Sequence, residues 1–401
     1  MEHRISRQMT DATDAYGRRL GAYLEQSSYT RLRGGPGVID LAFGDPHEFP
    51  APALVEVLQR HLSPQHTDWF AYTRDHPPAQ ESVAATLSRE LGLPFAADDV
   101  ALTNGAFAGL TICLRSVCDP GDEVIYLDPA WFYYEPIIAS VGAVPRPVAL
   151  TPGSWRLDAD LVAAAITPRT SAVIVNSPNN PTGAVYTDDE FAALAEVLRE
   201  ASARNGRPIY LLSDEAYRRI VFGGRPCPSP ATHYPYTFLV HTYTKTLLLP
   251  GERVGYVAIP PTTPDPAVLR RALTVARLTT GWAFPNNSLL FALPELEQHA
   301  VQVKPIEQRR DLLVDALREA GYEVQPSEGT FYLMARVPDA DDWTHAALLE
   351  EHGLLVLPAS VMGAPGYLRL SLTVTDEMLE ETIGRLRSAR PSNREHAGVQ
   401  R

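Results

Sequence analysis

The chain has 401 residues, of which 45% are hydrophobic and 21% are charged, and its formal net charge at pH 7 is −13. This length suits two packed domains, and the composition is ordinary for a soluble globular enzyme. The negative charge argues against a nucleic-acid partner, and the sequence has no apolar run of about 18 residues that could span a membrane.

The amino-terminal residues lack the apolar core and cleavage site of a secretory signal. The chain has three cysteines, of which Cys113 and Cys118 are five positions apart in an apolar helical pattern. Such cysteines are typical of core packing rather than of a metal or redox site. We therefore expect a cytoplasmic protein without a metal site.

Short apolar runs alternate with helical patterns along the middle of the chain. We expect strands at residues 100–103, 123–127, 144–149, 172–175, 209–212, 237–240 and 254–259. Helices are expected at residues 106–117, 135–141, 158–166 and 188–203. This alternation predicts an α/β fold with a mostly parallel sheet between helices. In such folds ligands gather beyond the carboxyl ends of the strands.

The pattern changes towards the carboxyl terminus, where a smaller α+β unit is expected. Its helices are predicted at residues 305–320 and 342–352, and its strands at residues 322–324, 330–334, 354–357 and 367–372. The first 30 or so residues are helical and polar, which is typical of an arm that packs on another domain or subunit. The predicted parts are an arm at 1–40, a large domain at 41–290, a small domain at 291–390 and a frayed tail at 391–401.

Lys245 stands among hydroxyl groups where the strand at residues 237–240 ends, with Arg253 eight positions further on. A lysine held at a strand end beside a fixed cation is well placed to form a Schiff base with an aldehyde. Thr242, Thr244 and Arg253 are candidates to hold the phosphate of an aldehyde such as pyridoxal phosphate. The alternative for a single lysine is a surface position in a loop.

Two other strand ends carry groups that bind anions or orient a ligand. After the strand at 100–103, Gly105 makes a tight turn into a helix, and free N–H groups at a helix start favour an anion. The full spacing of a dinucleotide-binding loop is missing there. Asn180 follows the buried strand at 172–175, in a turn that two prolines and a glycine make rigid. Turn chemistry alone is the alternative for Asn180.

Asp214 comes at the end of the buried strand at 209–212, and Tyr217 follows three residues later. A carboxylate at a buried strand end needs a partner or a cationic ligand. A protonated pyridine nitrogen would serve, and the ion pair would keep that ring an electron sink. Tyr217 is then within reach of the phenolic oxygen of the same ring.

Together these motifs resemble those of the fold-type I pyridoxal-phosphate enzymes, and specifically the class I/II aminotransferases similar to aspartate aminotransferase. The resemblance spans residues 39–386 and depends on the ordered motifs N-S-P-N-N-P-T-G, S-D-E-A-Y and T-Y-T-K…G-E-R-V-G. It implies a large domain with a mostly parallel seven-stranded sheet between helices and a smaller α+β carboxy-terminal domain. It also implies an aminotransferase that moves an amino group between an L-amino acid and a 2-oxo acid through an aldimine on Lys245.

The resemblance implies a role for each residue of the motifs. Lys245 binds the cofactor and later shuttles a proton, while Asp214 pairs with the pyridine nitrogen. Asn180 and Tyr217 bind the phenolic oxygen of the ring. The residues expected to hold the cofactor phosphate are Gly105, Ala106, Thr242, Thr244 and Arg253.

Three further roles follow from the same resemblance. Trp131 is expected to stack on the cofactor ring, with Phe132 and Tyr134 as alternatives. Arg369 is expected to bind the α-carboxylate of the substrate together with Asn180, because a planar guanidinium offers two parallel donors. Tyr72 resembles the tyrosine that one subunit lends to the phosphate of the other, which makes the enzyme a homodimer.

The chain departs from the family pattern where the substrate and the reaction class are decided. Arg74 to Pro78 replace a usual glycine after Tyr72, and residues 358–363 replace a glycine-serine pattern. Two other reactions therefore stay open. One is γ-elimination or γ-replacement on S-adenosylmethionine, as in the aminocyclopropane-carboxylate synthases, and the other is that of an amino-acid oxidase or decarboxylase. A DNA-binding sensor is disfavoured by the acidic charge and by the short segment before residue 41.

The sequence leaves the substrate side chain open. The candidates to bind a second carboxylate are Arg31, Arg33 and Arg74. An aromatic cluster is available either for a large apolar side chain or for dimer packing, and its members are Trp69, Phe70, Tyr72, Trp282 and Phe284.

Overall fold

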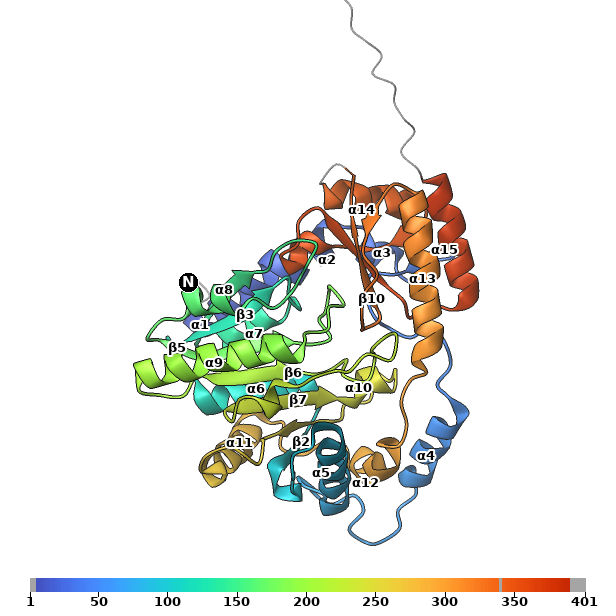
Figure 1. Cartoon of the computed structure of the whole chain (residues 1–401). Helices are drawn as coiled ribbons and strands as arrows, with labels where there is room; N and C mark the ends of the chain where they lie inside the picture. Colours follow the sequence, from blue (N-terminus) through green and yellow to red (C-terminus); the bar gives the residue numbers. More distant parts are fainter. Residues whose placement is uncertain (1–4, 339–340, 390–401) are drawn as a thin grey trace, which may run out of the picture.

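The structure is a computed structural model that describes residues 5–338 and 341–389. Its largest element is a seven-stranded sheet with the order β2-β8-β7-β6-β5-β3-β4. All neighbouring strands are parallel except the two pairs that involve β8. The mostly parallel α/β sheet that the sequence predicts is therefore confirmed (Figure 1). The strands are β2 (Val100–Thr103), β3 (Glu123–Asp128), β4 (Val144–Ala149), β5 (Thr170–Asn176), β6 (Tyr210–Asp214), β7 (Thr237–Thr242) and β8 (Gly255–Ala258).

Helices cover both faces of this sheet. In β5, Ala172 and Ile174 pack in one core, while Val173 and Val175 pack in another on the opposite face. This alternation explains why the central strands are apolar along their whole length. The helices of the first face are α6 (Ala106–Val117), α7 (Tyr134–Ser140) and α11 (Pro266–Thr280). Those of the second face are α8 (Ala159–Ala165), α9 (Asp188–Asn205), α5 (Pro77–Leu91) and α12 (Asn287–Leu296), and α4 (Pro52–Leu62) packs on α12.

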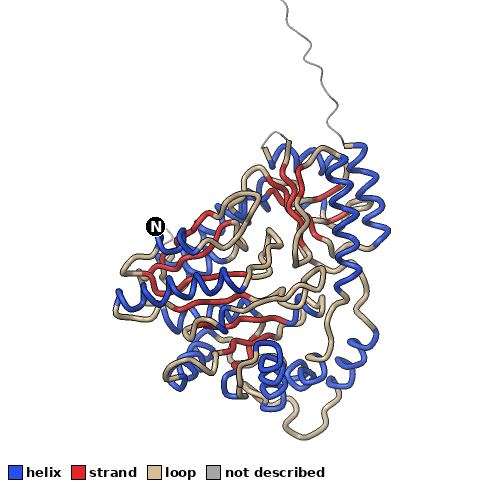
Figure 2. Tube along the Cα trace, viewed as in Figure 1, coloured by secondary structure: helices blue, strands red, loops and turns tan. Residues whose placement is uncertain are grey.

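A second, four-stranded sheet has the order β12-β13-β10-β9, and its paired strands are antiparallel. Figure 2 shows its strands apart from those of the larger sheet, with the long helices labelled α13 and α15 in Figure 1 on its outer side. The strands are β9 (Glu323–Val324), β10 (Tyr332–Arg336), β12 (Leu357–Pro358) and β13 (Tyr367–Ser371). The helices of this part are α13 (Val303–Glu319), α14 (Asp342–Glu351) and α15 (Asp376–Ser388).

The amino-terminal segment contacts both parts of the molecule. Its helix α1 (Arg7–Tyr16) lies beside α7, and Arg19 forms ion pairs with Asp128 and Glu135. Further on, β1 (Ile39–Asp40) pairs in parallel with β11 (Leu354–Leu355). The remaining helices of this segment are a π-helical turn at Gly17–Gly21, α2 (Ala22–Gln26) and α3 (Tyr29–Leu32).

The structure differs from the sequence-based expectation in the strands around residue 355. The prediction of a single strand at residues 354–357 was wrong, because β11 pairs with β1 whereas β12 pairs with β13. The stretch with Pro77 and Pro78 is the first turn of α5, where proline needs no hydrogen-bond donor. The tail predicted at residues 391–401 lies outside the described residues. No helix within the described ranges is long and apolar enough to cross a membrane.

Candidate active site

A cavity of about 240 Å³ lies between the carboxyl ends of the parallel strands and the smaller sheet. This end of a parallel sheet is where ligands bind in α/β proteins. All the predicted site residues except Gly105 and Tyr72 line the cavity. The lining residues are Phe43, Gly44, Asp45, Ala106, Phe107, Trp131, Phe132, Asn176, Asn180, Asp214, Ala216, Tyr217, Thr242, Thr244, Lys245, Arg253, Tyr332 and Arg369.

Lys245 lies in the short helix α10 (Tyr243–Thr246), which begins directly after β7. Thr242 precedes this helix, and its hydroxyl accepts a hydrogen bond of 3.4 Å from the Thr244 N–H. The amine Nζ of Lys245 lies 5.5 Å from the centre of the Phe331 ring. The short helix therefore brings the amine to the cavity from the edge where β7 ends.

Arg253 lines one end of the cavity, next to Gly105 at the amino terminus of α6. Gly105 has a φ of +88°, and a Cβ there would lie 2.7 Å from Nη2 of Arg253, so a larger residue would displace the guanidinium. Nη1 of Arg253 donates to the Pro250 carbonyl at 3.0 Å, and burial lowers the pKa of Arg253. Among the described residues no carboxylate is its partner.

The hydroxyls of Thr242 and Thr244 lie 2.7 Å apart at this same end of the cavity. Together with Arg253 and the free N–H groups at the start of α6, they make a site that can bind a phosphate-sized anion.

Asp214 ends β6 and is buried at the wall of the cavity. Burial raises the pKa of its carboxyl from 3.8 to about 6, and the nearby Lys245 acts in the opposite direction. Tyr134 donates a hydrogen bond of 2.6 Å to Oδ2, and the Ala216 N–H donates one of 3.2 Å to Oδ1. A cationic ligand in the cavity would favour the ionised carboxylate, as a buried acid requires.

The loop after β5 carries Asn180 and is held by side-chain hydrogen bonds. Asn176 donates from Nδ2 to the Asp214 carbonyl at 2.8 Å and accepts from the Asn180 N–H at 2.7 Å. Asn179 accepts from both the N–H and the hydroxyl of Thr182, at 3.1 and 2.8 Å. These bonds tie the position of Asn180 to the end of the neighbouring strand β6.

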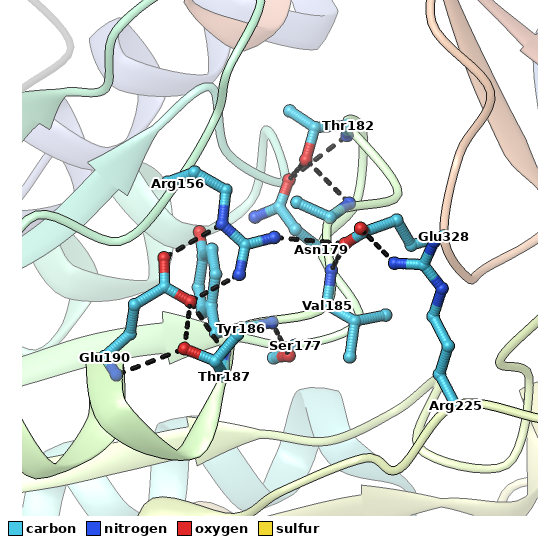
Figure 3. Close-up of polar contacts among 11 residues, drawn as sticks. Arg156, Ser177, Asn179, Thr182, Val185, Tyr186, Thr187, Glu190, Arg225 and Glu328 are labelled. Atoms are coloured by element: carbon cyan, nitrogen blue, oxygen red, sulfur yellow. Dashed lines mark hydrogen bonds and ion pairs between the residues drawn. The ribbon is translucent and has the colours of Figure 1, made fainter.

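Glu328, which precedes β10, joins the same loop to its surroundings (Figure 3). Its carboxylate accepts a hydrogen bond of 2.9 Å from the Val185 N–H and pairs with Arg156 and Arg225. Arg156 in turn pairs with Glu190 of α9. The backbone N–H groups of residues 328 and 329 both donate to the Gly183 carbonyl at 3.0 Å. The segment leading into the smaller sheet is thus bound directly to the loop that carries Asn180.

Arg369 of β13 is 1% exposed, although it lines the cavity. Nη1 donates to Oδ1 of Asn180 at 2.9 Å and Nη2 donates to the Ala42 carbonyl at 2.6 Å. Both partners are neutral oxygens, and Nε has no partner among the described residues. Burial lowers the pKa of Arg369. A buried guanidinium whose hydrogen bonds go to neutral groups can bind a carboxylate from a ligand.

Tyr217 and Trp131 also line the cavity. Burial raises the pKa of the Tyr217 hydroxyl well above its usual value, so the group stays protonated and can donate to a ligand oxygen. Of the two alternatives to Trp131 for ring stacking, Tyr134 uses its hydroxyl on Asp214, whereas Phe132 lies 5.9 Å from the Arg369 guanidinium.

Tyr72 lies outside the cavity of its own chain. Its side chain is 90% exposed and its ring contacts Phe284 at 5.1 Å. Its neighbours in the predicted aromatic cluster do not line the cavity either, and these are Trp69, Phe70, Trp282 and Phe284. The three arginines considered for a second carboxylate do not line the cavity and have partners within the chain, namely Ser28 for Arg31, Asp45 of the cavity lining for Arg33 and Asp75 for Arg74.

Sequence reasoning missed several residues of the site. Asn176 begins the asparagine-proline motif, so its position at a strand end was a usable signal. The role of Tyr134 had no such signal, because it contacts Asp214 across 80 positions of sequence. Tyr332, Phe43 and Phe107 are aromatic residues that local patterns do not distinguish from core residues. Within the described part of the chain, no group of three or more His, Cys, Asp or Glu side chains could hold a metal ion.

The chain is similar to known proteins over most of its length. The family model "Aminotransferase class I and II" matches residues 36–386. A probable aspartate/prephenate aminotransferase of Aquifex aeolicus is 32% identical over an alignment of 371 residues that covers 88% of this chain and 91% of the relative. The methionine aminotransferase of Escherichia coli is 30% identical, with 87% of this chain and 91% of the relative covered.

Solved structures show the same similarity. An aminotransferase from Eubacterium rectale has a TM-score of 0.85 and 26% identity, and the match covers 97% of this chain and 96% of that one. The aspartate aminotransferase of Thermus thermophilus with maleate has a TM-score of 0.79 and 27% identity, with 96% and 100% covered.

Proposed function

The chain belongs to the class I and II aminotransferase family, and from this premise we propose the role of each residue in its cavity. Enzymes of the aspartate aminotransferase type use pyridoxal phosphate, and this chain is a pyridoxal-phosphate-dependent aminotransferase that acts on amino acids and 2-oxo acids. The enzyme class and cofactor that the motifs predict are thereby confirmed.

The polar groups of the cavity suit this cofactor at three points. Arg253, the hydroxyls of Thr242 and Thr244, and the start of α6 at Gly105 and Ala106 suit the phosphate. Asp214, whose pKa burial raises to about 6, suits a protonated pyridine nitrogen. The amine of Lys245 suits the aldehyde. The observation that carries the proposal is that Lys245, Asp214 and Arg253 line one cavity.

The remaining residues are assigned to the ring and the substrate. We infer that Trp131 stacks on the ring and that Asn180 and Tyr217 donate to its phenolic oxygen. Arg369 binds the α-carboxylate of the amino acid, and its existing bond to Oδ1 of Asn180 holds the guanidinium in place.

When bound, pyridoxal phosphate supplies an electron-withdrawing ring that stabilises negative charge at the α-carbon of the amino acid. Asp214 keeps that ring protonated by staying ionised beside it. Lys245 takes the α-proton on Nζ and holds it for return. Arg369 fixes the carboxylate so that the α-carbon stays within reach of Nζ.

The proposal extends to the assembly and location of the enzyme. We propose a homodimer in which each Tyr72 is lent to the phosphate of the other subunit, which its 90% exposure allows. Exposed aromatic rings beside it suit a subunit contact, and these are Phe70, Trp282 and Phe284. We also propose a cytoplasmic location, which the three free cysteines favour. The domain limits proposed are those predicted from the sequence, a large domain at 41–290 and a small one at 291–390.

The test is a half-reaction with single amino acids. The purified holoenzyme is mixed with each amino acid in turn, and we expect a 2-oxo acid and pyridoxamine phosphate to form in equal amounts. A panel that yields neither product contradicts the proposal. Release of methylthioadenosine from S-adenosylmethionine, or oxygen consumption with an amino acid, would instead support the other reactions considered.

A further inference from the structure

Aromatic rings surround the arginine that is proposed to bind the α-carboxylate. The Arg369 guanidinium lies 4.0 Å from the centre of the Tyr332 ring and 5.9 Å from that of Phe132. Phe43 lies 6.3 Å from Phe132 in an edge-to-face arrangement with an angle of 86°. A carboxylate bound to Arg369 would therefore lie beside aromatic rings.

Phe107 adds a ring that is still available for contact. It lies in the first turn of α6 and packs edge-to-face against Trp131 at 5.0 Å with an angle of 83°. Its side chain is 37% exposed although it lines the cavity. A ligand ring can cover this surface in the same edge-to-face geometry.

The cavity offers few charges for a substrate side chain. Among the described residues that line it, the cations are Lys245, Arg253 and Arg369, each of which already has a role in the proposed function. The lining also has two acids: Asp214, which has a role in the proposed function as well, and Asp45, which pairs at 2.6 Å with Arg33 outside the lining. Among the side chains of one subunit, a second carboxylate on the substrate would thus meet rings and an acid rather than a cation.

We propose that the preferred amino acid of this enzyme has an aromatic or large apolar side chain rather than an acidic one. The inference rests on the proposed function, because it takes Arg369 as the partner of the α-carboxylate. A side-chain carboxylate would lose its hydration without gaining an ion pair. An aromatic side chain would gain contacts with Phe107, Phe132 and Tyr332.

The test compares four amino acids in single-turnover half-reactions of the holoenzyme. Leucine, asparagine and aspartate branch at the same carbon atom, so they vary polarity and charge at nearly constant shape, and phenylalanine adds the ring. We expect kcat/KM to be about 100-fold higher for phenylalanine than for aspartate. We also expect kcat/KM to be higher for leucine than for asparagine. Aspartate reacting as fast as phenylalanine would overturn the substrate class while leaving transamination intact. No product from any of the four, nor from the wider panel, would instead overturn the proposed function and this inference with it.

A variant of Phe107 tests whether the ring itself selects the substrate. Phe107→Ala should lower kcat/KM for phenylalanine about tenfold and leave that for aspartate within about twofold. Phe107→Leu, which keeps an apolar side chain, is the matched control. Its kcat/KM for phenylalanine should fall less than that of Phe107→Ala. Cofactor absorbance in each variant shows whether the neighbouring phosphate site is intact. If the variant retains the cofactor but loses kcat/KM equally for phenylalanine and aspartate, the selective role of Phe107 is contradicted.

Discussion

Tyr134 donates a hydrogen bond of 2.6 Å from its hydroxyl to Oδ2 of Asp214, and both side chains are buried. Burial raises the pKa of Asp214, and the tyrosine opposes this shift, because a donor to the charged form lowers the pKa of a carboxyl. Asp214 can bind a cationic ring only when it is ionised, so Tyr134 extends the pH range in which the cofactor site is competent.

Tyr134→Phe should therefore raise the pKa of Asp214 above its present value of about 6. The acid limit of pyridoxal phosphate binding to the cofactor-free protein should move upwards by about one pH unit, as expected for one bond to a charged group. Fluorescence titration of the cofactor between mildly acidic and neutral pH measures this limit. Tyr126→Phe is the control, because the Tyr126 hydroxyl bonds to Arg19 instead. Identical limits in wild type and Tyr134→Phe would contradict the role.

The raised pKa of Asp214 also has a consequence for folding of the cofactor-free protein. Between pH 3.8 and about 6 the folded carboxyl keeps a proton that the unfolded chain has released, so this group lowers stability as pH rises. The resulting loss in the free energy of unfolding is complete above about pH 6 and amounts to about 3 kcal/mol. In Asp214→Asn this dependence should disappear. Denaturant unfolding of the wild type and of Asp214→Asn across this pH range measures the free energy of unfolding. If that free energy depends on pH in the same way in both proteins, the expectation is wrong.

Lys245 and Lys304 are the two lysines of the sequence, which makes the covalent assignment easy to test. Borohydride reduction of the holoenzyme should fix the cofactor on Lys245 alone, and peptide mass spectrometry identifies the labelled lysine. Lys245→Ala should reduce turnover by a factor of about 10⁴ or more, as when a nucleophile is removed. Lys304→Ala replaces an exposed lysine and should keep full activity. Label on Lys304 would refute the assignment.

Glu328 should influence substrate binding although it lies outside the cavity lining. Glu328→Gln weakens the bond to the Val185 N–H and the pair with Arg156, so the Asn180 loop should become less well ordered. We expect KM for the amino acid to rise about fivefold, which corresponds to about 1 kcal/mol, with a smaller change in kcat. Arg225→Ala removes a more exposed partner of the same carboxylate and should change KM little. Equal effects of the two variants would contradict a specific role for the loop contact.

The proposed exchange of Tyr72 between subunits predicts complementation in mixed dimers. Tyr72→Phe should weaken cofactor binding about tenfold, because it removes a hydrogen bond to a charged group. Mixing this variant with Lys245→Ala places one intact Lys245 opposite one intact Tyr72 at a single site. Half of the sites in the hybrid should then regain wild-type cofactor affinity, as measured by absorbance titration of the tag-purified hybrid. Unrestored affinity in the hybrid, or a monomer in sedimentation, would argue against exchange.

The sequence predicted the larger sheet well because its strands are buried on both faces and stand out as short apolar runs. The ends of these runs predict the strand ends at Asn176, Asp214 and Thr242. Because the strands are parallel, these ends lie at one edge of the sheet, where the cavity is found. The helices α4, α5, α11 and α12 were not predicted. Apolar residues repeat weakly in α5, which packs on the sheet with small side chains such as Ala79 and Ala84.

The parts that the sequence could not predict depend on contacts between distant residues. The split of residues 354–357 into two strands is set by pairing with β1 and β13, which no local pattern encodes. The bonds of Arg369 to Asn180 and Ala42 span 189 and 327 positions. The rings around Arg369 come from three separate segments, so their convergence required the folded chain.

The pairing of β1 with β11 also limits how the molecule can be divided in the laboratory. Ile39 and Asp40 cover one edge of β11, and the Ala42 carbonyl just beyond them holds Arg369. A carboxy-terminal fragment expressed alone would expose that edge to other copies and release the guanidinium from its anchor. Grafting residues 39–45 back onto such a fragment should keep it from aggregating.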